Sequence, residues 1–169
     1  MIMKKFFGFL VMLMLCVCNV NGQNIYTNFN VGLDFNTNTN LVNTSLNLQI
    51  GYICDEYQSI ELDYTHGLKK DLLYYNRIGA NYMFNFTNKE NKLVPYLKLG
   101  CAYKSIGVDK TKFNIELCDI KIGIGFNYWV NNNTSIKIGI DLTNGFNDNI
   151  NFDWDNKLFA PNIGFTFIL

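Results

Sequence analysis

Apolar and polar side chains alternate with a period of two along most of this chain, the pattern of a β-strand with one apolar face. In residues 25–35, Phe29 and Leu33 lie on one face while Asn28 and Asp34 lie on the other. Seven more segments alternate in the same way, and they span residues 42–52, 59–65, 72–86, 93–104, 119–128, 135–143 and 159–169. Several exceed the length of an average strand in a soluble protein, about five or six residues. We therefore expect eight long strands.

The connections between these segments alternate in length. One set comprises residues 37–40, 66–71, 105–113 and 144–156. The other set is uniformly short and polar, and it comprises residues 54–56, 87–92 and 131–134. Short periplasmic turns and longer outer loops are typical of an up-and-down antiparallel barrel in an outer membrane.

The orientation of the two faces decides the class of barrel. The polar face is rich in Gly, Ser, Asn and Thr, whereas the apolar face carries Phe, Tyr, Leu and Ile. The interior of an eight-stranded barrel has room only for a compact set of side chains, so the small polar set fits inside and the bulky set faces lipid. The expected fold is an all-β, eight-stranded, antiparallel, up-and-down transmembrane β-barrel preceded by a cleaved signal peptide. A soluble secreted barrel that binds a ligand is the alternative.

Aromatic side chains cluster near both ends of the expected strands, which is typical of the girdles at membrane interfaces. The expected outer girdle contains Phe35, Tyr64, Tyr74, Tyr103 and Phe159, and the periplasmic girdle contains Tyr52, Phe86, Tyr128 and Phe167.

Residues 1–22 have the three parts of a secretory signal peptide. Lys4 and Lys5 precede an apolar run, and Gly22 ends a stretch of small or modest residues. The apolar run is too short for a spanning helix, which needs about 20 apolar residues. We expect cleavage before Gln23, which leaves residues 23–169 as an outer-membrane β-barrel domain.

Composition excludes two classes of protein. Charged residues are only 17% and aromatic residues are 15% of the chain, which is unlike a disordered protein. The 14 basic and 14 acidic residues balance, so the basic footprint of a nucleic-acid-binding protein is missing and no nucleic-acid partner is expected.

Three stretches resemble a known group of proteins. Residues 94–103 (VPYLKLGCAY) resemble the Pro-Tyr-then-Gly strand of the small outer-membrane β-barrel proteins, and residues 123–128 (GIGFNY) resemble another of their strands. The alternation of Ile163, Phe165 and Phe167 is similar to their C-terminal assembly signal. This family includes the OmpA barrel, OmpX and the opacity-type proteins. The resemblance implies an outer-membrane location, a lipid and lipopolysaccharide environment, and assembly by the barrel-assembly machinery and periplasmic chaperones.

Charged residues also fall on the inward face, where unpaired charges are costly. The expected lumen charge network consists of Asp34, Glu61, Asp63, Arg77, Lys98, Asp119, Lys121, Lys137 and Asp141. The hairpin symmetry of residues 57–86 places Asp63 close to Arg77. We interpret this network as a plug of the barrel, and a small-solute or ion pore is the alternative.

The outer loops are the remaining candidates for function. Basic residues expected near the outer rim, as contacts for lipopolysaccharide phosphates, are Lys69, Lys70, Lys104, Lys110 and Lys112. The single histidine, His66, is expected in a loop, and no His-x-Ser motif of a membrane-barrel lipid hydrolase is present. We therefore expect a monomeric, non-enzymatic protein of envelope integrity or adhesion to a host or surface ligand, without cofactor or metal. A lipid-modifying outer-membrane enzyme is the second alternative.

Overall fold

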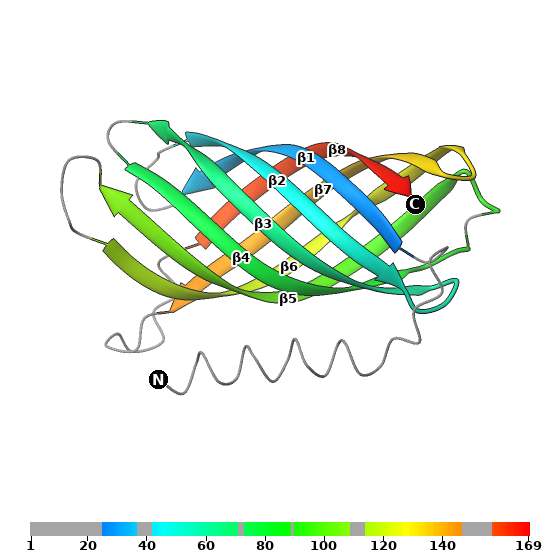
Figure 1. The fold of residues 1–169 in the computed structure, drawn as a ribbon, viewed down its shortest axis with the longest axis horizontal. Helices are drawn as coiled ribbons and strands as arrows, with labels where there is room; N and C mark the ends of the chain where they lie inside the picture. The colour runs from blue at the N-terminus through cyan, green and yellow to red at the C-terminus, as the bar shows by residue number, and fades with distance from the viewer. Residues whose placement is uncertain (1–24, 37–41, 71–72, 89, 109–113, 147–156) are drawn as a thin grey trace.

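The chain folds into one closed antiparallel barrel of eight consecutive strands, in which β8 also pairs with β1 (Figure 1). The computed structural model describes residues 25–36, 42–70, 73–88, 90–108, 114–146 and 157–169. The strands are β1 (Ile25–Asn36), β2 (Val42–Ile53), β3 (Gln58–Lys70), β4 (Leu73–Asn85), β5 (Leu93–Val108), β6 (Asn114–Asn131), β7 (Thr134–Phe146) and β8 (Lys157–Ile168). The fold class predicted from the alternation is confirmed. Within these ranges no helix has the length and apolar character to cross a membrane.

The register of the strands fixes the tilt of the barrel. A row of paired residues that starts at Tyr26 crosses all eight strands and returns to β1 at Asn36, ten residues further along. The row passes through Gly51, Glu61, Asn81, Gly100, Lys121, Thr143 and Leu158. A stagger of ten residues over eight strands corresponds to a strand tilt of about 40°. The same row therefore climbs toward the outer end of the barrel as it passes from β1 to β8.

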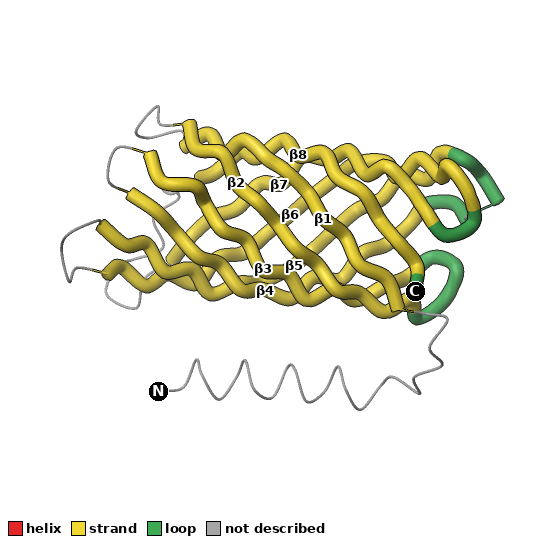
Figure 2. The backbone as a smooth tube through the Cα atoms, turned by 45° about the horizontal axis from the view of Figure 1, so that its top comes forward, coloured by secondary structure: helices red, strands yellow, loops and turns green. Residues whose placement is uncertain are grey.

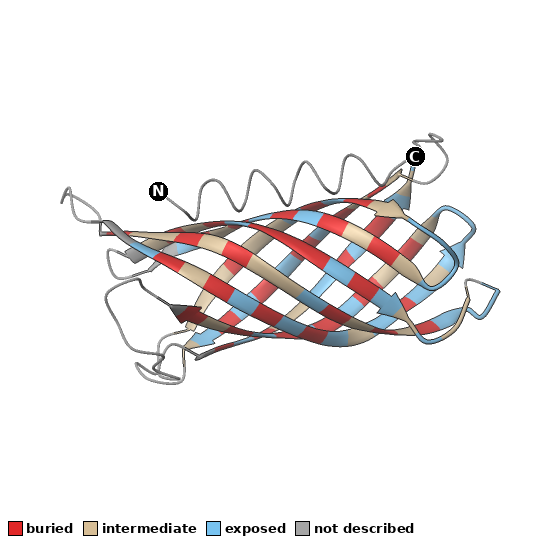
Figure 3. Ribbon diagram, turned by 90° about the horizontal axis from the view of Figure 1, so that it is seen from below, coloured by how far each residue is buried: buried red, intermediate tan, exposed pale blue. Residues whose placement is uncertain are grey.

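Buried and exposed residues alternate along every strand, as Figure 3 shows. On the outward side, Leu48 is 50% exposed and Ile122 is 48% exposed, whereas their inward neighbours Gln49 and Lys121 are 2% and 1% exposed. The apolar face is therefore outside and the polar face lines the lumen, as predicted. A wall of this size would be an unfavourable surface in water, which contradicts the alternative of a soluble secreted barrel.

The strands extend further toward the outer end than the alternation predicted. The stretch 66–70 belongs to β3, residues 105–108 belong to β5, and residues 144–146 belong to β7. His66 therefore lies in a strand, opposite Leu46 and Asn76, and its predicted loop position was wrong. The remaining outer connections, 37–41, 71–72, 109–113 and 147–156, lie outside the described residues, as does the expected signal peptide.

Three short connections lie at the opposite end, together with the C-terminus (Figure 2). They join β2 to β3, β4 to β5 and β6 to β7. Asp55 stabilises the first of these turns, because its Oδ1 accepts hydrogen bonds of 2.8 Å from the backbone amides of Tyr57 and Gln58. We refer to this end as periplasmic and to the other as outer.

Candidate functional site

The candidate site is the charged interior of the barrel. All nine residues of the predicted lumen network face inward, and none is more than 7% exposed. They are Asp34, Glu61, Asp63, Arg77, Lys98, Asp119, Lys121, Lys137 and Asp141. Lys104 joins them at 7% exposed. The described lumen therefore contains five acidic and five basic side chains. The predicted network had one base fewer, because it did not include Lys104.

Glu61 is the acceptor at the centre of the periplasmic half of the lumen. Its Oε1 lies 2.9 Å from Lys137 Nζ, 2.9 Å from Tyr26 Oη and 3.1 Å from Asn28 Nδ2. Gln49 Oε1 also accepts from Asn28, at 2.9 Å, and lies 3.3 Å from Lys137 Nζ. A buried carboxylate is stable when charged and polar donors replace its lost hydration. These five side chains from four strands form a layer across the lumen.

Two further ion pairs occupy the middle of the barrel. Lys98 Nζ lies 2.8 Å from Asp141 Oδ1, and Lys121 Nζ lies 3.0 Å from Asp63 Oδ2. Asn81 donates a 3.0 Å hydrogen bond to the other oxygen of Asp63. Each partner of an ion pair comes from a different strand, so the pairs connect the walls of the lumen to one another.

Arg77 lies close enough to Asp63 to interact with it electrostatically, as the hairpin symmetry predicted, although the two do not form the ion pair. Its backbone pairs with Thr65, two residues beyond Asp63, and its Nη2 donates a 3.1 Å hydrogen bond to the hydroxyl of Thr65. Asp63 forms its ion pair with Lys121, which lies 58 residues away in the sequence. Hairpin symmetry reports only on neighbours along the wall, whereas this partner lies across the lumen.

Asp34 and Tyr75 organise the outer part of the lumen. The Tyr75 hydroxyl donates to Asp34 Oδ2, and the Ser45 hydroxyl donates to Asp34 Oδ1 at 3.2 Å. The ammonium of Lys104 lies 4.9 Å from the centre of the Tyr75 ring, a cation–π arrangement. Lys104 is therefore an internal residue, and its predicted contact with lipopolysaccharide phosphates was wrong.

The other four predicted lipopolysaccharide contacts are not placed. Lys110 and Lys112 lie outside the described residues, and the side chains of Lys69 and Lys70, at the end of β3, are likewise outside what the structure describes.

Three tyrosines face the lumen: the alternation placed Tyr26 on the polar face, whereas Tyr75 and Tyr96 were not predicted as lumen residues although they share its parity. Tyr26, Tyr75 and Tyr96 are 3%, 5% and 1% exposed. Glycines on the adjoining strands leave room for their rings: a Cβ on Gly51 would collide with Tyr26, one on Gly67 with Tyr75, and ones on Gly125 and Gly139 with Tyr96. The signal available in the sequence was the parity of each tyrosine relative to neighbouring Asn and Lys residues.

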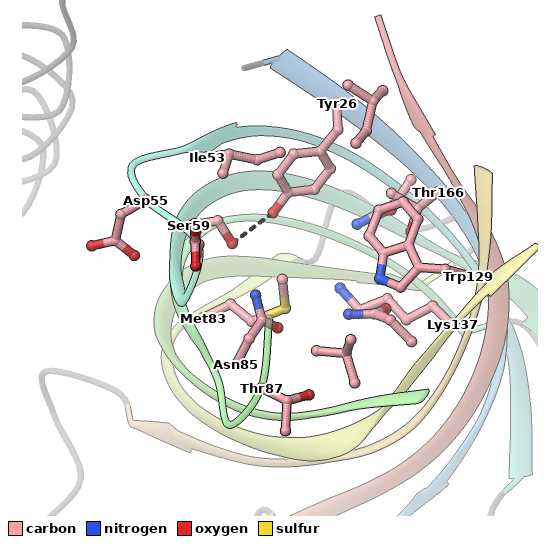
Figure 4. A pocket seen from close by; sticks show the side chains of 15 residues that line it. Tyr26, Ile53, Asp55, Ser59, Met83, Asn85, Thr87, Trp129, Lys137 and Thr166 are labelled. Atoms are coloured by element: carbon pink, nitrogen blue, oxygen red, sulfur yellow. Dashed lines mark hydrogen bonds between the residues drawn. The ribbon is translucent and has the colours of Figure 1, made fainter. Parts of the chain in front are cut away.

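Two cavities flank the buried network. The periplasmic one has a volume of about 30 Å³ and is lined by residues such as Tyr26, Met83, Asn127 and Trp129. Figure 4 shows Tyr26, Met83 and Trp129 around this cavity, with Lys137 extending toward its middle. The outer one has a volume of about 20 Å³ and its lining includes Asn30, Asn47 and Arg77. Ion pairs and hydrogen bonds occupy the space between the two.

One polar row also crosses the outward face near the outer end. His66, Asn76, Ser105 and Glu116 pair in register on β3, β4, β5 and β6. A histidine activates a serine only within hydrogen-bond reach. Here β4 separates His66 from Ser105, by about 10 Å for two strand spacings. The row contains the residue types of a hydrolase but not the required adjacency. Among the described residues there is no cluster of His, Cys, Asp and Glu that fits a metal ion.

The closed barrel, the exposed apolar wall and the charged lumen define an integral β-barrel of the outer-membrane type. The resemblance seen in the sequence is confirmed at the level of fold. No family model matches the chain. No curated protein matches it either.

Solved outer-membrane barrels have the same fold. The N-terminal β-barrel domain of OprF from Pseudomonas aeruginosa is 19% identical with a TM-score of 0.69, and the match covers 87% of this chain and 98% of that one. Neisserial surface protein A is 14% identical with a TM-score of 0.71, covering 88% of this chain and 98% of that one. The outer-membrane enzyme PagL is 10% identical with a TM-score of 0.57, covering 85% and 99%. At these identities the likeness concerns the fold.

Proposed function

We propose that this protein is a non-enzymatic, non-conducting outer-membrane barrel that contributes to envelope integrity. In this account the lipid-facing wall anchors the protein in the bilayer, and the connections at the outer end meet the surroundings. The observation that carries the proposal is the buried network across the lumen. Its ion pairs and tyrosines fill the space that a solute would need.

Opening the lumen to a solute would cost a large amount of free energy. A solute would have to separate ion pairs such as Lys137–Glu61, whose members are 1% and 0% exposed in their side chains. Breaking a buried pair leaves an uncompensated charge and costs about 3–5 kcal/mol. Opening two or three such pairs at once would cost about 6–15 kcal/mol, which is comparable with the whole stability of a domain, about 5–15 kcal/mol.

Two measurements test this proposal together. Purified protein reconstituted in a planar bilayer is expected to show no steps of ion conductance. A strain that lacks the protein is expected to become more sensitive to detergent and to large antibiotics that an intact outer membrane excludes. Steady conductance in the wild type, or an unchanged envelope in the deletion strain, would contradict the proposal.

A small-solute or ion pore is the second candidate, and the two cavities favour it. They lie toward opposite ends of the lumen, with buried ion pairs and hydrogen bonds between them. Under this candidate, substitution of Lys98 or Arg77 would change the conductance or ion selectivity, whereas under our proposal the wild type has no conductance to change.

We also propose that the protein adheres to a host or surface ligand. Adhesion would depend on residues 147–156, where Trp154 and three acidic residues occur. We also propose that the protein is a monomer, that the barrel-assembly machinery inserts it, and that residues 1–22 are removed. Replacement of residues 147–156 by a Gly-Ser linker tests adhesion, since binding of cells to a host surface should fall while barrel folding is retained.

A further inference from the structure

The polar row on the outward face consists of His66, Asn76, Ser105 and Glu116 and lies toward the outer end of the wall. One step closer to the periplasmic end, the same strands carry Tyr64, Ile78, Tyr103 and Cys118. Tyr64 is 44% exposed and Ile78 is 50% exposed. The wall therefore changes from apolar to polar within a single register step on four adjacent strands.

Hydrogen bonds order this polar row along the wall. The Oδ1 of Asn76 accepts from the hydroxyl of Tyr64 at 2.8 Å and lies 2.8 Å from Nδ1 of His66. The hydroxyl of Tyr103 donates to the carboxylate of Glu116. Tyrosine rings therefore lie beside the polar groups and hold two of them in place.

The barrel geometry places this row at the level of the lipid headgroups. A register row climbs toward the outer end from β1 to β8, by about 3 Å per strand at this tilt. Glu116 on β6 thus lies about 9 Å further out than His66 on β3. The row begins at the edge of the apolar wall and rises through the interfacial region, where tyrosines are typical.

The chemistry of this polar row fits a sugar. The Asn76 amide, the Ser105 hydroxyl and the Glu116 carboxylate offer both donors and acceptors to vicinal hydroxyl groups. Tyrosine combines an apolar ring face with a polar edge, which suits the two faces of a sugar. The carboxylate of Glu116 repels a phosphate. The exposed side chains of Tyr64 and Ile78 lie on the membrane side, where an acyl chain would extend.

We propose that this row is a binding site for the sugar headgroup of an outer-leaflet glycolipid. The lipid's sugar lies against Asn76, Ser105 and Glu116, and its acyl chains run along the wall below. This inference goes beyond the proposed function, and it holds whether or not the lumen conducts ions.

The test uses the purified full-length protein in nanodiscs of phosphatidylcholine. One set contains monoglucosyl-diacylglycerol as the probe, and a second set contains phosphatidic acid at the same fraction. Native mass spectrometry then counts the lipids retained by the wild type, by the triple variant Asn76→Leu/Ser105→Ala/Glu116→Leu, and by Glu116→Gln. The matched control is Thr44→Val, which removes a hydroxyl from β2, opposite the outward residue Leu33. Heat-modifiable gel migration verifies that each variant is folded.

The wild type and Thr44→Val are expected to retain the glucosyl lipid about ten-fold more than the triple variant, as the loss of two or three hydrogen bonds predicts. Glu116→Gln is expected to lie between them. Equal retention by the wild type and the folded triple variant would overturn the inference. A preference of the wild type for phosphatidic acid, strengthened in Glu116→Gln, would overturn it as well, because the site would then recognise phosphate.

Discussion

Lys137 Nζ lies 2.9 Å from Glu61 Oε1, although the two residues are 76 positions apart and stand on β7 and β3. The contact crosses the lumen, because β3 and β7 are not neighbours in the barrel. The Lys137 ammonium also lies 5.0 Å from the centre of the Tyr96 ring. The interior therefore links strands that share no backbone hydrogen bonds.

Removing either member of this pair should destabilise the barrel. Glu61→Gln and Lys137→Met each leave a buried charge without its partner, at a cost of about 3 kcal/mol. The double variant should cost clearly less than the sum of the two. Urea unfolding of the refolded protein in detergent micelles measures all three. Glu56→Gln, at an exposed turn residue, is the control and should change stability by less than about 0.5 kcal/mol. Strictly additive effects would show that the two side chains do not interact.

Lys104 should behave as a lumen residue. Lys104→Met leaves five acids against four bases inside the barrel and removes the contact with Tyr75, so the free energy of unfolding should fall by about 2 kcal/mol. Binding of lipopolysaccharide in mixed micelles should be unchanged. The opposite result, normal stability with weakened lipopolysaccharide binding, would place Lys104 at the outer surface.

Gly125 should tolerate a methyl group poorly. A Cβ there would collide with the backbone carbonyl of Ile138, and would lie only 2.6 Å from the Tyr96 hydroxyl. Gly125→Ala should therefore lower stability by about 2 kcal/mol. Gly32→Ala is the matched control, because its Cβ would lie 3.1 Å from Ser45 Oγ and 3.3 Å from the Pro161 carbonyl; it should cost less than about 1 kcal/mol. If the two variants unfold alike, the close packing of Gly125 against Ile138 and Tyr96 does not contribute to stability.

Cleavage of residues 1–22 is a prediction from the sequence. N-terminal sequencing of the protein from an outer-membrane fraction should begin at Gln23. A mature chain that begins at Cys16 or Cys18 with an attached lipid would instead identify a lipoprotein signal.

The alternation of side chains was sufficient to predict the barrel and the orientation of its faces. It also placed all nine predicted lumen charges on the inward side, because parity is preserved along an unbroken strand. It underestimated the outer ends of the strands. There the outward residues His66, Asn76, Ser105 and Glu116 are polar, so the hydrophobic alternation ends before the backbone pairing does.

The partners across the lumen were not predictable from the sequence in this way. The Lys121–Asp63 pair depends on the stagger of ten residues around the barrel, which no local pattern reports. Lys104 shares the parity of Lys98 and Gly100, and that parity was the correct guide to its position; its proximity to an expected loop was misleading. Tyr75 and Tyr96 follow the same rule, since their parity outweighs their apolar rings.

The central claim is that the apolar wall contacts lipid while the polar face surrounds a closed interior. Its most direct test is the quenching of tryptophan fluorescence by brominated lipids. Ile122→Trp, in a background of Trp129→Phe and Trp154→Phe, should be strongly quenched. A protein that retains only Trp129, which lines the periplasmic cavity, should be quenched far less. Weak quenching at position 122, with strong quenching by an aqueous agent such as iodide, would contradict the account.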